Sequence, residues 1–164
     1  MGAENGKNRQ AEGAKLQFIV RNRKAWHDYE VLERFEAGIS LMGSEVKSMR
    51  LGKVNVSDSY AALVDGQVFL KNLHISAYEM ATTNSHEPLR QRRLLLHKRE
   101  IRKLMKATET KGLTLVPLAL YFKNGRVKVE LAIARGRKRY DKRDALAKRE
   151  SERDMQRAAK RDAH

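Results

Sequence analysis

The 164-residue chain is predicted to fold as a mainly β domain, a small closed antiparallel barrel, followed by a basic tail. Apolar and polar residues alternate in several short stretches, and Asp65-Gly66 and Asn124-Gly125 separate neighbouring stretches as dipeptides that favour tight hairpins. This alternation stops after Ala134. Because a flat isolated sheet leaves long unpaired edges, closure into a barrel is favoured over the alternative, an open sheet covered by helices.

The chain before residue 42 predicts four segments in order. The first is polar and lacks periodicity, which is typical of disorder. The last is a long strand whose odd-numbered positions from Tyr29 to Leu41 are expected on one buried face, with Glu36 on the opposite, polar face. The expected segments are disorder at 1–15, a strand at 16–20, one helical turn at 25–28 and the long strand at 29–41.

A change of period from two to 3.6 after Gly43 predicts a short helix, with Ser44 as its cap and Val46, Met49 and Leu51 inward. A second helix is expected with Ile101, Leu104 and Met105 inward. Pro117 has no N–H to donate, which places it at an edge or a bulge. The expected ranges are helices at 45–51 and 97–110, strands at 54–56, 60–64, 67–70, 73–77, 113–122 and 126–134, and a polar loop at 79–88.

The composition indicates the kind of partner. The chain carries 35 Lys plus Arg and a net charge of +15, which points to nucleic acid first and to an anionic membrane second. It has no cysteine, so disulfides, thiolate metal sites and a cysteine nucleophile are excluded. No apolar run is long enough to span a bilayer, and the N-terminus lacks a signal-peptide core, so a soluble cytoplasmic protein is expected.

An enzyme finds little support in the sequence. The five histidines lack metal-ligand spacing, and no phosphate-binding glycine loop is present. His27, Asp28 and Glu30 lie close together, but on a strand the two acids share one face while the histidine points away. No catalytic residue, metal or cofactor is therefore expected.

Binding of folded RNA agrees better with the residues, and a basic barrel is typical of the oligonucleotide-binding fold. Scattered cations fit phosphate contacts, while an aromatic content of 6% argues against an array of base-stacking platforms. Glu36 is either a structural salt-bridge partner or a hydrogen-bond acceptor for RNA. Leu95 is either a core residue or an exposed contact for an unstacked base. The scattered cations are Arg21, Arg23, Lys24, Arg50, Lys53, Arg90, Arg92, Arg93 and Lys128.

The segment 135–164 holds 12 Lys plus Arg against 6 Asp plus Glu, which gives it +6 of the total charge. Its large apolar side chains, Tyr140, Leu146 and Met155, are too few to form a buried stripe. Most of its residues nevertheless favour helices. A tail of this kind is expected to be disordered alone and helical against a partner.

The string FEAGISLMGSEVKSMRLGKVNVSDSY at 35–60 is the most specific of the sequence. Four further strings accompany it: RNRKAWHDYEV at 21–31, EPLRQRRLLLHKREI at 87–101, GLTLVPLALYFKNGRVKVELAIARG at 112–136 and RKRYDKR at 137–143. These strings, in their order along the chain, resemble the SsrA-binding proteins, also called small protein B, the partners of transfer-messenger RNA.

The resemblance implies a barrel of about six strands with about three helices, spanning 16–134. It implies a non-enzymatic monomer that binds the tRNA-like domain of transfer-messenger RNA and brings it to stalled ribosomes, where the tail 135–164 becomes helical in the vacant mRNA channel at the decoding site. The rival function is that of a basic structural protein of the ribosome, and a nuclease comes third. The expected RNA-binding residues are Asn22, Lys24, His27, Glu36, Arg50, Lys53, Leu95 and Lys128, and the expected decoding-site residues are Gly136, Arg137, Lys138, Tyr140, Asp141, Lys142 and Arg143.

Overall fold

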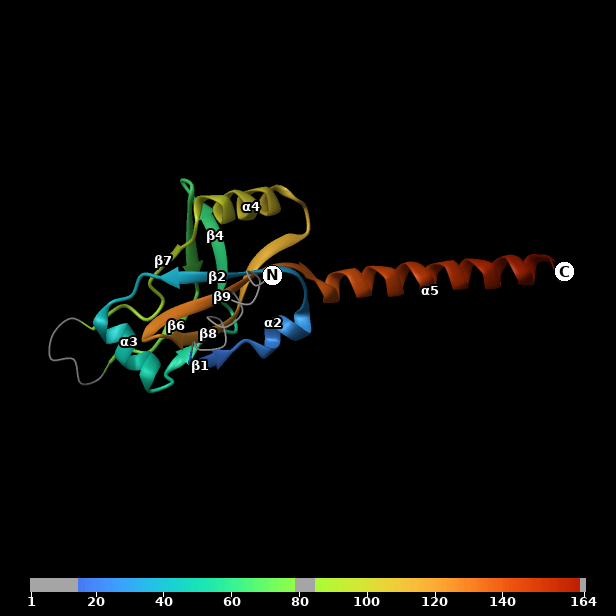
Figure 1. Cartoon of the computed structure of the whole chain (residues 1–164). Coiled ribbons are helices and arrows are strands. Elements are labelled where there is room, and N and C mark those ends of the chain that lie inside the picture. The colour runs from blue at the N-terminus through green and yellow to red at the C-terminus, as the bar shows by residue number, and fades with distance from the viewer. Residues whose placement is uncertain (1–14, 79–84, 163–164) are drawn as a thin grey trace, which may run out of the picture.

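The computed structural model describes residues 15–78 and 85–162 and shows a mainly β body from which a long helix projects (Figure 1). Residues 1–14 of the disorder predicted at 1–15 and residues 79–84 of the loop predicted at 79–88 lie outside the described residues. The elements are β1 (Leu16–Arg21), α2 (Arg23–Asp28), β2 (Tyr29–Ile39), α3 (Gly43–Arg50), β3 (Val54–Asn55), β4 (Tyr60–Val64), β5 (Gln67–Lys71), β6 (His74–Ile75), β7 (Arg92–Leu95), α4 (Lys98–Glu109), β8 (Leu113–Lys123), β9 (Arg126–Gly136) and α5 (Arg137–Asp162).

Six strands form a closed ring in the order β8-β4-β5-β7-β2-β9 and back to β8. This arrangement confirms the predicted closure of a mainly β domain. The contact that closes the ring between β4 and β8 is the antiparallel pair of Ala61 with Leu115. Strand β1 adds to β8 outside the ring, and β3 pairs with β6 in a separate small sheet.

The main core fills the ring. It is built from the alternating residues Val129, Leu131 and Ile133 of β9, with Met49 of α3 and Leu104 of α4 packed into the same cluster. A second, smaller cluster lies on the other side of β8 and β9, where α2 covers alanines and valines that point outward from the ring. It comprises Ala25, Val116, Leu118, Ala132 and Ala134.

A bulge in β2 splits the single buried face that the alternation predicts. Val31 pairs with Ala134, but Glu33 pairs with Ile133, so Leu32 is an extra residue that shifts the phase of the strand by one. Val31 therefore packs on the outer cluster, whereas Phe35 packs inside the ring. In β8, the register also shifts just after Pro117, as its missing N–H predicts.

The two helices predicted at 45–51 and 97–110 are present, but each has one residue exposed that was predicted to point inward. Helix α3 begins at Gly43, and the Met42 N–H donates to Glu45 Oε1 at 2.8 Å. Leu51, predicted to point inward, is 61% exposed because it follows the last helical turn. In α4, Leu104 and Ala107 provide the buried side, and Met105 is exposed instead of inward.

Arg92 is not the surface cation that the sequence predicts. It is the first residue of β7, a strand that the sequence does not predict, and its side chain is fully buried. Its guanidinium forms an ion pair with the buried Glu45 and donates to the Leu73 carbonyl at 2.7 Å and to the Pro88 carbonyl at 3.1 Å. Arg90 also bonds Glu45, at 2.5 Å. These contacts make the cluster a structural one.

Burial raises the pKa of the Glu45 carboxyl, but the hydrogen bonds from Arg90, from the Met42 N–H and from Arg92 outweigh it and lower the pKa overall. Glu45 is therefore held as a carboxylate and Arg92 as its counter-ion. The cluster ties the start of α3 to β7 and to the loop before it.

The tail is a continuous helix in the structure, where the sequence predicts disorder in the free chain. Helix α5 spans 26 residues, and residues 149–160 are exposed throughout (Figure 1). The physical reason is local, since the segment lacks proline and places Glu150 three residues before Arg153 and Asp154 three before Arg157. The side chains of residues 138–148 are outside the described part.

Candidate RNA-binding surface

Strand register gathers several predicted site residues on one outer face of the ring. Leu95 pairs with Gly38, Gly38 with Lys128 and Lys128 with Tyr121, and Tyr121 pairs with Phe18 of β1. Directly opposed residues point to the same side of a sheet. These five residues thus form one row across β7, β2, β9, β8 and β1. We call this row, together with Glu36, which lies two register pairs from Gly38 and so points to the same side, the outer strand face.

Glu36 accepts several hydrogen bonds at the centre of the outer strand face. The Tyr121 hydroxyl donates to Oε2 at 2.5 Å, and Lys123 Nζ lies 3.1 Å from Oε1 and 3.3 Å from Oε2. Burial raises the pKa of Glu36, but these hydrogen bonds and the charges of Lys123 and Lys128 lower it overall. The side chain is 39% exposed, so an ionised acceptor remains open to a ligand.

Leu95 is 50% exposed, so it is not the core residue that was one of the two alternatives left open by the sequence. It lies over Gly38 of the neighbouring strand: a Cβ added to that glycine would meet the Leu95 Cβ at 3.2 Å. Glycine at position 38 therefore lets the leucine lie close against β2. The result is an apolar side chain beside Glu36 and Lys128 on one face.

Asn22 is buried and bonded to the protein itself. Its Oδ1 accepts from the Ala25 N–H at 3.1 Å and caps α2, and its Nδ2 donates to the Pro117 carbonyl at 2.8 Å. Only 2% of the residue is exposed. The structure therefore places Asn22 as a residue that positions α2 on β8.

Lys24 and His27 lie on α2, and each has an acidic partner. Lys24 Nζ is 3.1 Å from Asp58, and the hydrogen bond and charge of that carboxylate raise the lysine pKa. His27 Nδ1 is 2.9 Å from Asp28. Both basic side chains remain mostly exposed, at 58% and 73%. They form a separate group near α2 and are not part of the outer strand face.

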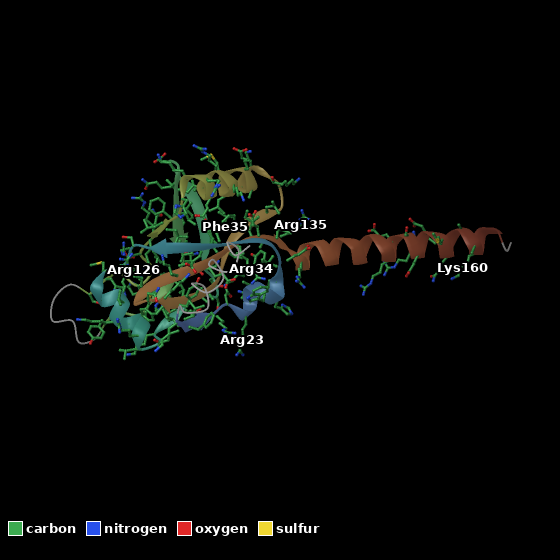
Figure 2. All side chains as sticks on the ribbon, in the orientation of Figure 1. Arg23, Arg34, Phe35, Arg126, Arg135 and Lys160 are labelled. Carbon is green, nitrogen blue, oxygen red and sulfur yellow. The ribbon has the colours of Figure 1, made fainter. Side chains whose placement is uncertain are left out.

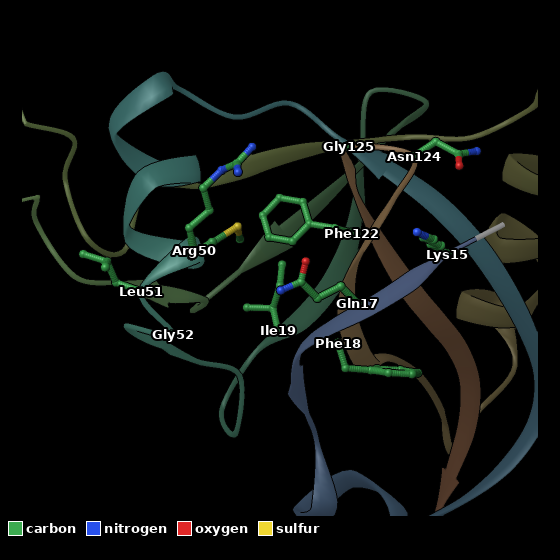
Figure 3. A pocket seen from close by; sticks show the side chains of 11 residues that line it. Lys15, Gln17, Phe18, Ile19, Arg50, Leu51, Gly52, Phe122, Asn124 and Gly125 are labelled. Carbon is green, nitrogen blue, oxygen red and sulfur yellow. The ribbon is translucent and has the colours of Figure 1, made fainter.

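Arg50 and Lys53 lie at the end of α3 and beyond it. Arg50 stacks over the Phe122 ring, with Cζ 5.3 Å from the ring centroid. It lines a groove of about 890 Å³ between α3 and β1. Figure 3 shows Arg50 and Leu51 on the α3 side of this groove, Ile19 and Gln17 on the β1 side, and the Phe122 ring between them. The Lys53 side chain is exposed.

Aromatic residues are few, yet the structure places a cation on several of them, which the 6% aromatic content did not predict. Arg21 lies 4.1 Å from the Phe18 ring centroid, and Arg34 lies 5.2 Å from that of Trp26. Phe18 also packs against Tyr121, with ring centroids 5.7 Å apart. Pairing of Phe18 with Tyr121 across β1 and β8 depends on register and was not visible in the sequence.

The predicted tail residues begin directly at the end of β9. Gly136 pairs with Tyr29, and Arg137 Nε donates to the Tyr29 carbonyl at 3.1 Å. The predicted contacts of Lys138, Tyr140, Asp141, Lys142 and Arg143 fall on side chains outside the described part, so they stay predictions. Figure 2 shows Arg34 and Arg135 near the ring and Lys160 far out along α5.

The residues that the structure describes include no group of three or more His, Cys, Asp or Glu side chains that could hold a metal ion. Within the same residues, no helix is long and apolar enough to cross a membrane. The side chains that gather are hydrogen-bonding, cationic and aromatic, a combination suited to RNA.

Comparison with known proteins identifies the family. The model of the SmpB protein family matches residues 19–161. The chain belongs to the SmpB family. An SsrA-binding protein of Syntrophobacter fumaroxidans is 52% identical over 155 residues, which cover 94% of this chain and 96% of the relative. An SsrA-binding protein of Carboxydothermus hydrogenoformans is 54% identical over 142 residues, which cover 87% and 95%.

A solved structure described as "tmRNA-SmpB: a journey to the center of the bacterial ribosome" contains a chain that is 52% identical, with a TM-score of 0.61. The match covers 71% of this chain and 82% of that one. Membership of the SmpB family thus rests on most of the sequence and on the fold. The resemblance seen in the sequence strings is confirmed.

Proposed function

We propose that this SmpB-family protein binds the tRNA-like domain of transfer-messenger RNA and delivers it to stalled ribosomes in the cytoplasm. The names of its relatives support this function, since they are SsrA-binding proteins and the similar solved chain is part of a tmRNA–SmpB structure. The observation on this chain that carries the proposal is the outer strand face, where Glu36, Leu95 and Lys128 meet by register. The protein acts by binding and not by catalysis.

The outer strand face supplies three kinds of contact to a folded RNA. Glu36 accepts hydrogen bonds from a base edge or a 2′-hydroxyl, Lys128 and Lys123 contact phosphates, and Leu95 packs against an unstacked base. Arg50, Lys53, Lys24 and His27 extend the basic surface, while Asn22 holds α2 in place. Helix α5, with the decoding-site residues at its start, reaches into the mRNA channel.

Capture of RNA from a lysate by the full-length protein, followed by sequencing, tests the proposal. We expect one tRNA-like RNA to be enriched above all others. Enrichment of bulk ribosomal RNA alone would instead favour the rival function of a structural ribosomal protein.

Glu36→Ala is expected to weaken binding to the tRNA-like RNA at least about tenfold, because a hydrogen bond to a charged group contributes about 1.5–3 kcal/mol. The body should stay folded, since an exposed ion pair contributes about 0–1 kcal/mol. Filter binding measures the affinity, and circular dichroism checks the fold. Glu33→Ala on the same strand, which removes a similarly exposed pair with Lys103, is the matched control. Equal affinity of the Glu36 variant and the parent would count against recognition.

RNA affinity is expected to fall steeply with salt, since each phosphate contact adds about 0.7–0.9 to the slope of log K against log salt. Lys53→Ala should make that slope shallower by at most the contribution of one phosphate contact, about 0.7–0.9. Lys111→Ala, an exposed cation beyond α4, should leave it unchanged. Titrations between low and high salt measure both. A binding constant that does not respond to salt would contradict the electrostatic contribution.

A further inference from the structure

The groove between α3 and β1 shares only Phe18 with the outer strand face, so that face does not account for it. Its walls come from the C-terminal turn of α3, from β1 and from the turn between β8 and β9 (Figure 3). Its volume of about 890 Å³ is large enough for one nucleotide.

Arg50 presents a prearranged stacking plane in this groove. Phe122 is almost fully buried and supports the guanidinium from below, at 5.3 Å from centroid to Cζ. Within the described residues Arg50 forms no ion pair, so its charge has no acidic partner there. A guanidinium that contacts a ring on one side can take a base on its other side, because bases stack on arginine planes as they do on aromatic rings.

The remaining lining residues provide what a nucleotide needs besides stacking. Lys15 supplies a second cation without an ion-pair partner in the described part of the chain, suited to a phosphate. The side-chain amides of Gln17 and Asn124 each carry donors and an acceptor for a base edge. Figure 3 shows the Gln17 amide directed toward the Phe122 ring. Stacking, charge and amides thus surround one space.

We propose that the α3–β1 groove binds a single unstacked nucleotide, with the base on Arg50, the base edge at Gln17 and the phosphate near Lys15. This inference rests on the proposed function for the source of the nucleotide, which is a bound RNA. A free mononucleotide has the same chemistry, and the experiment separates the two sources. The site extends recognition from the outer strand face around β1 to the end of α3.

The decisive variant is Arg50→Lys in the full-length protein, because it keeps the charge and removes the stacking plane. We expect affinity for a tRNA-like-domain transcript to fall about tenfold, because the base loses the plane on which it stacks, while the salt slope stays that of the parent. Gln17→Ala should weaken binding less. Arg102→Lys on α4, an exposed arginine outside the groove, is the matched control and should have no effect.

Ultraviolet crosslinking with mass spectrometry should join an unpaired nucleotide of the transcript to the peptide that contains Gln17 or Arg50 in the parent, and less in Arg50→Lys. The same assay with AMP, GMP, CMP and UMP should give no saturable binding. If Arg50→Lys binds as the parent does, Arg50 is only a phosphate contact and the nucleotide site is wrong. If the parent binds a mononucleotide saturably and Arg50→Lys does not, the nucleotide in the groove does not come from a bound RNA. A parent that fails to bind the transcript at all contradicts the proposed function instead.

Discussion

A chain ending at Arg137 is expected to fold and to bind the tRNA-like RNA nearly as the full protein does, yet to lose peptide tagging on stalled ribosomes. It keeps the hydrogen bond from Arg137 to the Tyr29 carbonyl and the whole ring. It loses a helix whose outer part, residues 149–160, is exposed and contributes nothing to the core. RNA affinity and the yield of tagged peptide in a reconstituted translation system measure the two activities separately.

Point variants test whether the loss of peptide tagging arises from residues at the start of the tail. Tyr140→Ala should reduce tagging more than Tyr140→Phe, since stacking needs the ring and not the hydroxyl. Joint replacement of Asp141, Lys142 and Arg143 by alanine should resemble the truncation. Normal tagging by the truncated chain would remove the tail from the mechanism, and lost RNA affinity would show that the two activities are not separable.

Arg92→Met is expected to lower the free energy of unfolding by about 3–5 kcal/mol, because it takes from the buried Glu45 carboxylate the fully buried one of its two counter-ions. The Leu73 and Pro88 carbonyls also lose a donor. Urea unfolding followed by circular dichroism measures the change.

Arg93→Met is the matched control, since Arg93 is the next residue of β7 and is exposed. Its effect should lie within about 0.5 kcal/mol, as is usual for a surface substitution. The double variant Glu45→Met with Arg92→Met should recover part of the loss, because the buried carboxylate is then removed together with its buried counter-ion. If Arg92→Met is as mild as the Arg93 control, the buried ion pair is not a stabilising element.

The sequence predicts the strands well where short-range chemistry determines them. Asp65 and Asn124 both adopt positive φ angles in the hairpin turns that their Asp-Gly and Asn-Gly pairs predict. Alternation along β9 likewise identifies the buried Val129 and Leu131. These signals are local, so a single sequence contains them.

Long-range contacts explain what the sequence did not reveal. Arg92 looks like Arg93 in sequence, and only its pairing with Glu45, 47 positions away, makes it buried. The bulge at Leu32 follows from the pairing of β2 with β9 and has no sequence signal of its own. The outer strand face likewise exists only once register places Leu95 beside Gly38. For the same reason the candidate site was predicted as a collection of residues and not as a surface.

Helix α5 follows β9 without any linker, since Gly136 ends the strand and Arg137 begins the helix. At about 1.5 Å per residue its 26 residues form a rod roughly 39 Å long. Such a rod is a lever arm, and a rotation of the body by about 10° would carry its tip by about 7 Å at this length. A small tilt of the ring on its RNA is thereby magnified into a displacement about as large as the spacing between neighbouring nucleotides in a chain.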